Sequence, residues 1–269
     1  MMIIAVLFVF LFGLAIGSFL NVVIYRFNTG RGLGGRSGCM NCGKTLEWYE
    51  LFPVVSFLVQ RARCRKCSSK LSWQYPAVEF LTGILFASTF VKYISEPHEW
   101  HVLFSFILML IVWSLLVVIV VYDFRHKIIP DSLVYTFAAL GLLRIFVTVP
   151  HSPAYIFYGT LLAGPALFLP FFILWFISGG RWIGLGDGKL ALGIGWMLGL
   201  GYGLSAIVLG FWVGALFSVV YMLITHLKLK GKNITMKSEI PFAPYLILGF
   251  AIVYFLSIDV MGLYSIFKI

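Results

Sequence analysis

Four cysteines with metal-ligand spacing carry the most legible chemistry in the sequence. Cys39 and Cys42 form one C-x2-C pair, Cys64 and Cys67 form another, and the chain has no other cysteine. Two such pairs can present four thiolates to one tetrahedral ion, which is a donor set of structural zinc sites. Four thiolates leave no open coordination position, so we predict a zinc ion that is structural. A pair of disulfides is the alternative that the spacing leaves open.

Two aspartates beside long apolar segments are the next candidates for chemistry. Asp123 follows one apolar run in Val-Val-Tyr-Asp-Phe-Arg, and Asp187 precedes another in Gly-Leu-Gly-Asp-Gly-Lys. An ionisable side chain at membrane depth is costly and usually functional. Two carboxylates at one depth can share a proton, so that one activates water while the other polarises a peptide carbonyl. For either acid alone, a structural role at the membrane boundary is the alternative interpretation.

Other residues near these acids, or at a helix start, are candidates for supporting roles. Three glycines around Asp187 expose backbone and would let a substrate strand approach the acid. The lysine that follows favours the ionised form of Asp187. A glutamate at the head of another apolar segment either complements the positive end of that helix or has a function of its own. These candidates are Gly184, Gly186, Gly188, Lys189 and Glu79.

The elements that must position these residues are membrane helices. The chain has 269 residues, of which 61% are hydrophobic and only 11% are charged, whereas soluble domains carry about 25% charged residues. We therefore predict an all-α polytopic membrane protein with about eight transmembrane helices and a small zinc-binding insert. The apolar segments are 3–22, 77–93, 102–122, 132–148, 155–178, the short segment 188–200, then 204–225 and 242–258.

The charges predict the orientation of these helices. Lys and Arg number 20 against 10 Asp and Glu, and basic residues stay in cytoplasmic loops. Residues 21–76 hold nine basic and two acidic residues, so we expect this insert, and both aspartates, on the cytoplasmic side of the cell membrane. The basic surplus then reports topology and contact with the lipid bilayer, and it does not predict nucleic-acid binding. The predicted segments are a first helix at 1–22, the insert at 23–76 and a helical bundle at 77–269.

An ordered set of motifs resembles the type IV prepilin peptidases, which are G-x-G-D membrane aspartic proteases. The resemblance begins at Gly17-Ser18-Phe19-Leu20-Asn21-Val22-Val23-Ile24-Tyr25-Arg26 and includes both cysteine pairs. It continues through Gln74-Tyr75-Pro76-Ala77-Val78-Glu79, through the stretch from Asp123 to Ile129-Pro130-Asp131, and through Gly186-Asp187-Gly188-Lys189. The match covers nearly the whole chain.

This resemblance implies a fold, an activity and a set of partners. It implies that Asp123 and Asp187 are catalytic, and that the cysteines form a cytoplasmic zinc site. It also implies cleavage of the basic leader peptide from type IV prepilins and type II secretion pseudopilin precursors at the cytoplasmic membrane face. Many members also N-methylate the new amino terminus with S-adenosylmethionine. The insert has no glycine-rich dinucleotide-type motif, so no residue is assigned to that cofactor, and Arg26-Phe27-Asn28 departs from the usual Arg-Leu-Pro.

Two other functions are compatible with parts of the pattern. The first is an intramembrane G-x-G-D aspartic protease that has another membrane-peptide substrate and no methyltransferase activity. The second is a membrane scaffold with a zinc module, in which the aspartates are structural. The order of the motifs favours the prepilin peptidase over both.

Overall fold

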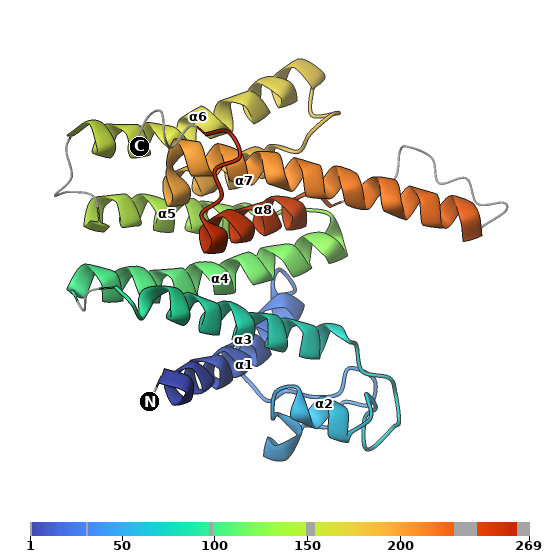
Figure 1. Ribbon diagram of the computed structural model, residues 1–269. Helices are drawn as coiled ribbons and strands as arrows, with labels where there is room; N and C mark the ends of the chain where they lie inside the picture. Colours follow the sequence, from blue (N-terminus) through green and yellow to red (C-terminus); the bar gives the residue numbers. More distant parts are fainter. Residues whose placement is uncertain (1, 31, 97–98, 149–153, 229–240, 263–269) are drawn as a thin grey trace. The chain divides into compact units, whose positions relative to one another are not determined.

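The computed structural model describes residues 2–30, 32–96, 99–148, 154–228 and 241–262. Within these ranges the regular secondary structure is helical, without strands, and two isolated antiparallel bridges occur in the insert. The all-α prediction is confirmed (Figure 1). The helices are α1 (Met2–Arg26), η1 (Trp48–Glu50), α2 (Val55–Val59), α3 (Gln74–Tyr93), α4 (Trp100–His126), α5 (Asp131–Thr148), α6 (Ala154–Ser178), α7 (Leu185–Lys228) and α8 (Ala243–Leu256).

Each of the eight apolar segments falls on a helix. Among the described residues, α1, α4, α5, α6 and the part of α7 up to Ile224 are long and apolar enough to cross a membrane. The prediction of a polytopic membrane protein is therefore confirmed by five such helices, while α3 and the shorter α8 carry the segments at 77–93 and 242–258. The segments 188–200 and 204–225 both lie in α7, where Gly199 has φ 79° and ψ 179° and interrupts the helix. A positive φ with an extended ψ is a conformation that glycine adopts at little steric cost.

The chain forms two compact units that divide within α4, Met1–Val118 and Ile119–Ile269. In the first unit, α1 packs along α3 (Figure 1). A side chain at Gly13 would lie 2.8 Å from the Cα atom of Gly83, and one at Gly17 would lie 2.6 Å from the Cα atom of Glu79. Small residues therefore let the two backbones approach closely, as is common between membrane helices. The cysteine insert connects these two helices.

In the second unit, α7 packs against α5, α6 and α8 (Figure 1). Glycines on α7 make each approach close. A Cβ atom at Gly193 would meet the ring of Phe137 in α5 at 2.4 Å, and one at Gly195 would meet the carbonyl of Ala163 in α6 at 2.6 Å. Farther along, a Cβ atom at Gly210 would lie 3.0 Å from the Cα atom of Leu246 in α8. The helix that begins beside Asp187 is therefore held on several sides.

Candidate active site and metal centre

The two aspartates occupy the ends of different helices in the second unit. Asp123 lies in the last turn of α4, which ends where Lys127 adopts φ 53° and donates its N–H to the Asp123 carbonyl at 2.8 Å. Asp187 lies in the first turn of α7. Both are buried, with exposed fractions of 3% for Asp123 and 8% for Asp187. Because both aspartates lie at helix ends, neither carboxylate has to be placed in the apolar middle of the bundle.

These carboxylates interact with each other and with nearby backbone groups. Asp187 lies within electrostatic range of Asp123 and accepts the backbone N–H of Gly184. Asp123 accepts the backbone N–H of Ala243, the first residue of α8. Its Oδ2 atom is buried and has no hydrogen-bond partner within the described part of the chain. Buried polar atoms are normally satisfied, so this oxygen is available to a proton, a water molecule or a substrate.

The glycines around Asp187 do not share one environment. A Cβ atom at Gly186 would lie 3.1 Å from that of Ile129, and one at Gly188 would lie 3.0 Å from that of Phe171. Close packing against the α4–α5 connection and against α6 therefore accounts for these two glycines without a substrate. Gly184 is exposed, and a Cβ atom there would lie 3.5 Å from Oδ2 of Asp187. Of these three glycines, Gly184 is the one at which we still expect a substrate strand to approach Asp187. This approach stays a prediction.

Lys189 joins the start of α7 to the start of α5. Its Nζ atom lies 2.7 Å from Oδ1 of Asp131 and 4.8 Å from the centre of the Tyr135 ring. The sequence predicts Lys189 as a neighbour that favours the ionised form of Asp187, whereas the ion pair in the structure is made with Asp131. Spacing along one helix does not reveal a partner on another helix, which explains the difference.

The four cysteine sulfurs converge as the spacing predicts. All four Sγ atoms lie within 4.8 Å of one another, with separations of 3.8 Å for Cys39–Cys67 and 4.0 Å for Cys42–Cys64. All are free thiols, since a disulfide requires about 2.05 Å between sulfurs. Zn–S bonds of about 2.3 Å in a tetrahedron place sulfurs about 3.8 Å apart. The cluster therefore has the donor set and spacing to hold a metal ion.

Two matching backbone turns build this cluster. The N–H of Cys39 donates to the Lys44 carbonyl, and the N–H of Gly43 donates back to the Cys39 carbonyl, both at 2.9 Å. In the second turn, Cys64 N–H donates to the Ser69 carbonyl, and Ser68 N–H donates to the Cys64 carbonyl, both also at 2.9 Å. Positive φ angles of 68° at Gly43 and 56° at Ser68 close the turns.

The thiols differ in acidity because their hydrogen-bond donors differ. The Ser69 hydroxyl and backbone N–H lower the pKa of Cys67 to about 6, and the N–H groups of Cys42 and Asn41 lower the pKa of Cys39. For Cys42, the backbone N–H of Lys44 favours the thiolate, but burial and the neighbouring thiols outweigh it and raise the pKa to about 11. A bound cation would ionise all four thiols.

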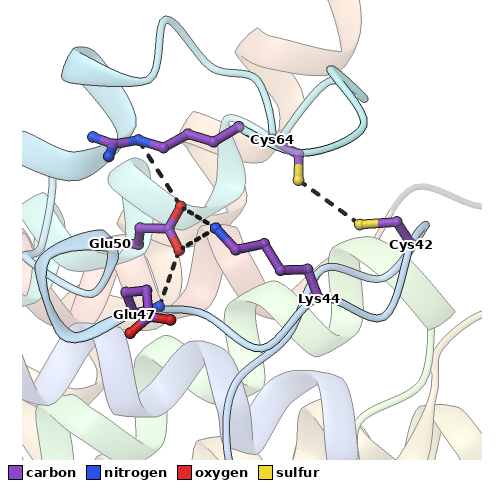
Figure 2. A network of polar contacts seen from close by, with 6 residues as sticks. Cys42, Lys44, Glu47, Glu50 and Cys64 are labelled. Atoms are coloured by element: carbon purple, nitrogen blue, oxygen red, sulfur yellow. Dashed lines mark hydrogen bonds and ion pairs between the residues drawn. The ribbon is translucent and has the colours of Figure 1, made fainter.

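A buried carboxylate supports the first turn (Figure 2). Glu50 receives the ammonium of Lys44 at 3.0 Å, the N–H of Glu47 at 3.0 Å and the guanidinium of Arg65 at 3.9 Å. The Glu47 N–H and the two cations hold the pKa of Glu50 below its usual range. The only sequence signal for this network is that Glu50 is one of two acids among nine basic residues.

Glu79 lies with the cysteines in the first unit. Its side chain is buried in α3, where Oε2 accepts the N–H of Val54 at 2.7 Å and the carboxylate accepts the Ser18 hydroxyl. The sequence singles out the acid but neither partner, because Ser18 and Val54 are distant from it along the chain.

Buried acids at helix ends and a four-thiol cluster in a polytopic helical chain define a membrane protein of the aspartic peptidase class. The chain belongs to the type IV leader peptidase family. Residues 11–93 match the bacterial peptidase A24 N-terminal domain, and residues 109–219 match the type IV leader peptidase family model.

Several relatives are similar over nearly their whole length, and each is named prepilin leader peptidase/N-methyltransferase. The Bacillus subtilis protein is 30% identical, with 95% of this chain and 96% of that protein covered. The Pseudomonas aeruginosa protein is 28% identical, with 90% and 87% covered. The Legionella pneumophila protein is 29% identical, with 94% and 92% covered. No solved structure matches the chain.

Proposed function

We propose that this protein is a membrane aspartic endopeptidase that removes the leader peptide from type IV prepilins and type II secretion pseudopilin precursors, and then N-methylates the new amino terminus. Family membership and the relatives named prepilin leader peptidase/N-methyltransferase support both activities. The observation that carries the peptidase is the pair of buried, interacting carboxylates of Asp123 and Asp187. This reading is favoured over a G-x-G-D protease with a different membrane-peptide substrate.

The acidic pair can hydrolyse a peptide bond if it holds one proton between two carboxyl groups. The ionised carboxyl accepts a proton from the attacking water, while the protonated one donates a hydrogen bond to the scissile carbonyl. The proton then passes to the leaving amine as the tetrahedral intermediate breaks down. Like charges that interact disfavour double ionisation, which maintains the singly protonated pair.

The insert holds one structural zinc ion through Cys39, Cys42, Cys64 and Cys67 in this proposal. The convergence of four free thiols supports it. Zinc binding would supply folding free energy that an insert of this size draws only weakly from its own core.

The proposed orientation places the insert and the acidic pair on the cytoplasmic side, with 1–22 as the first span, 23–76 as the insert and 77–269 as the peptidase bundle. The support is the distribution of basic residues, which is densest at 21–76. A precursor with a basic leader and an apolar helix would then have its scissile bond at the membrane surface. The basic insert would repel the leader, so shape, depth and the acidic pair must select the substrate.

Asparagine substitutions test the peptidase directly. Asp123→Asn or Asp187→Asn should lower the rate of leader cleavage by at least about a thousandfold, while the protein still inserts and keeps its zinc content. The assay is cleavage of a purified prepilin in detergent, followed by mass measurement of the product with and without S-adenosylmethionine. Wild-type cleavage by either variant would refute the mechanism. Trapping with the Asp187→Asn protein should recover pilin-like precursors, and recovery of unrelated membrane peptides would favour the broader protease.

A further inference from the structure

The cysteine insert carries a group of exposed apolar side chains on η1, on α2 and on the turn between them. Five large side chains are between 53% and 72% exposed: Trp48, Phe52, Val55, Leu58 and Val59. Trp48 packs edge-on against Phe52 with ring centres 5.9 Å apart, and η1 contacts α2. Single exposed apolar residues are ordinary, whereas a group of them marks an interaction site. We call these five residues the apolar surface of the insert.

Two contacts fasten α2 to the start of α3. Phe57, which is the buried residue of α2, packs edge-on against Trp73 with ring centres 4.9 Å apart. At the beginning of α2, the N–H of Val54 donates to Oε2 of Glu79 in α3 at 2.7 Å. Because α2 turns Phe57 toward α3, the apolar surface of the insert is left on its outer side.

Glu79 in turn places α2 close to a membrane-spanning part of α1. A Cβ atom at Gly17 would lie 2.6 Å from the Cα atom of Glu79, and the Glu79 carboxylate accepts the Ser18 hydroxyl. Gly17 and Ser18 lie inside the apolar run 3–22, and α1 is long and apolar enough to cross a membrane. The start of α2 is therefore one glutamate side chain away from a helix segment that belongs in the bilayer. This holds whichever side of the membrane the insert occupies.

The exposed charge beside the apolar surface of the insert is positive. Between Trp48 and Val78 the chain has one acid, Glu50, whose side chain is 1% exposed. The same stretch has five basic residues, all of which are exposed: Arg61, Arg63, Arg65, Lys66 and Lys70. Exposed Trp, Phe and Leu next to Lys and Arg are typical of segments that lie in the membrane interface, and the cations complement anionic headgroups. A basic leader peptide would be repelled from the same place.

We propose that the apolar surface of the insert enters the boundary between lipid headgroups and acyl chains, and that Arg61 and Arg63 contact the phosphates of anionic lipids. Trp48 then lies at the headgroup level, where tryptophan is enriched in membrane proteins. Because α1 and α3 already hold the insert at the bilayer, the contact restricts how the insert moves relative to these helices. The inference does not depend on the proposed peptidase activity.

Photo-crosslinking in vesicles tests the contact directly. The full-length protein carries a benzophenone amino acid in place of Leu58 and is reconstituted in equimolar phosphatidylcholine and phosphatidylglycerol. After illumination, mass measurement should find lipid adducts, with those of phosphatidylglycerol about fivefold in excess, the effect of one cation near an anionic surface. The matched probe replaces Ser68, an exposed polar residue of the second cysteine turn, and should give a several-fold lower yield of lipid adducts.

Two double variants, made with the probe at position 58, separate the apolar contact from the charge contact. Phe52→Ser with Val59→Ser should lower the yield of lipid adducts several-fold. Leu33→Ser is the matched control, because Leu33 is a 52% exposed leucine ahead of the first cysteine turn, and it should leave the yield unchanged. Arg61→Gln with Arg63→Gln should remove the excess of phosphatidylglycerol adducts while lipid adducts persist. Zinc content and thermal unfolding show whether each variant is folded.

The remaining outcomes decide against the inference. Absence of lipid adducts at position 58, or equal yields at positions 58 and 68, would overturn the membrane contact. Crosslinking to a second copy of the chain, or to an added prepilin, in place of lipid would assign the apolar surface of the insert to that partner instead. The Asp187→Asn protein should give the same adducts as wild type, so failure of this inference and failure of the peptidase are distinguishable.

Discussion

At the scale of single residues, the buried acids differ in what surrounds them, and the sequence selects all of them except Glu50. Asp123 and Asp187 interact electrostatically with each other. Glu79 accepts hydrogen bonds from neutral groups, whereas Glu50 is close to two cations. Residue type and spacing identify the candidates, whereas their partners come from other helices or from loops. The role of each acid therefore depends on its partners, and each can be tested separately.

Lys189 is expected to act as a positioning residue for Asp187 through its pair with Asp131. The Asp131 side chain is 65% exposed, so the pair should contribute only about 0.2–1 kcal/mol to stability. Its removal in Lys189→Gln should lower kcat for leader cleavage several-fold with little change in KM. A double-mutant cycle with Asp131→Asn checks this, because the double variant should be no slower than either single one. Additive losses would show that the two residues act independently.

Glu50 predicts a pH dependence of stability. The pKa of its carboxyl is lower in the folded protein than its ordinary value of 4.5. The ionised form therefore stabilises the insert fully above pH 4.5, and this contribution is lost as the pH falls through the lowered folded pKa. Glu50→Gln should lower the Tm at neutral pH, and the difference from wild type should shrink in acid. Thermal unfolding at matched zinc content measures it, and a difference that grows in acid would contradict the assignment.

At the scale of elements, long apolar runs predict the helices well because a backbone in lipid must satisfy its hydrogen bonds internally. They also separate 188–200 from 204–225, and the structure interrupts α7 close to this boundary, at Gly199, although the runs do not specify the backbone conformation there. Nor do they show that Gly186 and Gly188 pack against Ile129 and Phe171. These features depend on contacts between segments that are distant in the sequence, and one sequence without known neighbours does not specify them. The metal-binding turns are easier to predict, since both ligands of each pair lie in one short segment.

The contact between α1 and α3 gives a prediction for helix packing. Gly17→Ala would place a methyl group 2.6 Å from the Cα atom of Glu79, so one backbone must move. Such overpacking costs typically about 1–3 kcal/mol. Gly32→Ala is the control, because no atom lies within 4 Å of its added Cβ and its φ is not positive. Denaturation in detergent should separate the two variants, and equal stabilities would show that the crossing tolerates expansion.

At the scale of the whole molecule, the described fold places its two chemistries in separate compact units. The thiol cluster and Glu79 belong to Met1–Val118, and the acidic pair belongs to Ile119–Ile269. Chelation of zinc should therefore increase hydrogen exchange in the insert while the amides of α5 to α8 keep their protection. Hydrogen exchange with mass analysis, before and after chelation, measures this. A uniform loss of protection would mean that the protein unfolds as one unit.

The charge distribution gives the last prediction, which concerns orientation in the membrane. Nine basic and two acidic residues between 21 and 76 leave an excess of seven positive charges in the segment that contains all four cysteines. Basic loops stay cytoplasmic, so a membrane-impermeant maleimide should label the cysteines in inverted vesicles but not in intact cells. Chelation should increase this labelling, because metal-bound thiolates are protected. A cysteine introduced by Glu99→Cys in a cysteine-free background is the matched control, since Glu99 lies in a turn without basic residues and should be labelled only from outside. Labelling of the native cysteines in intact cells would place the insert on the outer face and reverse the proposed direction from which a leader reaches the acidic pair.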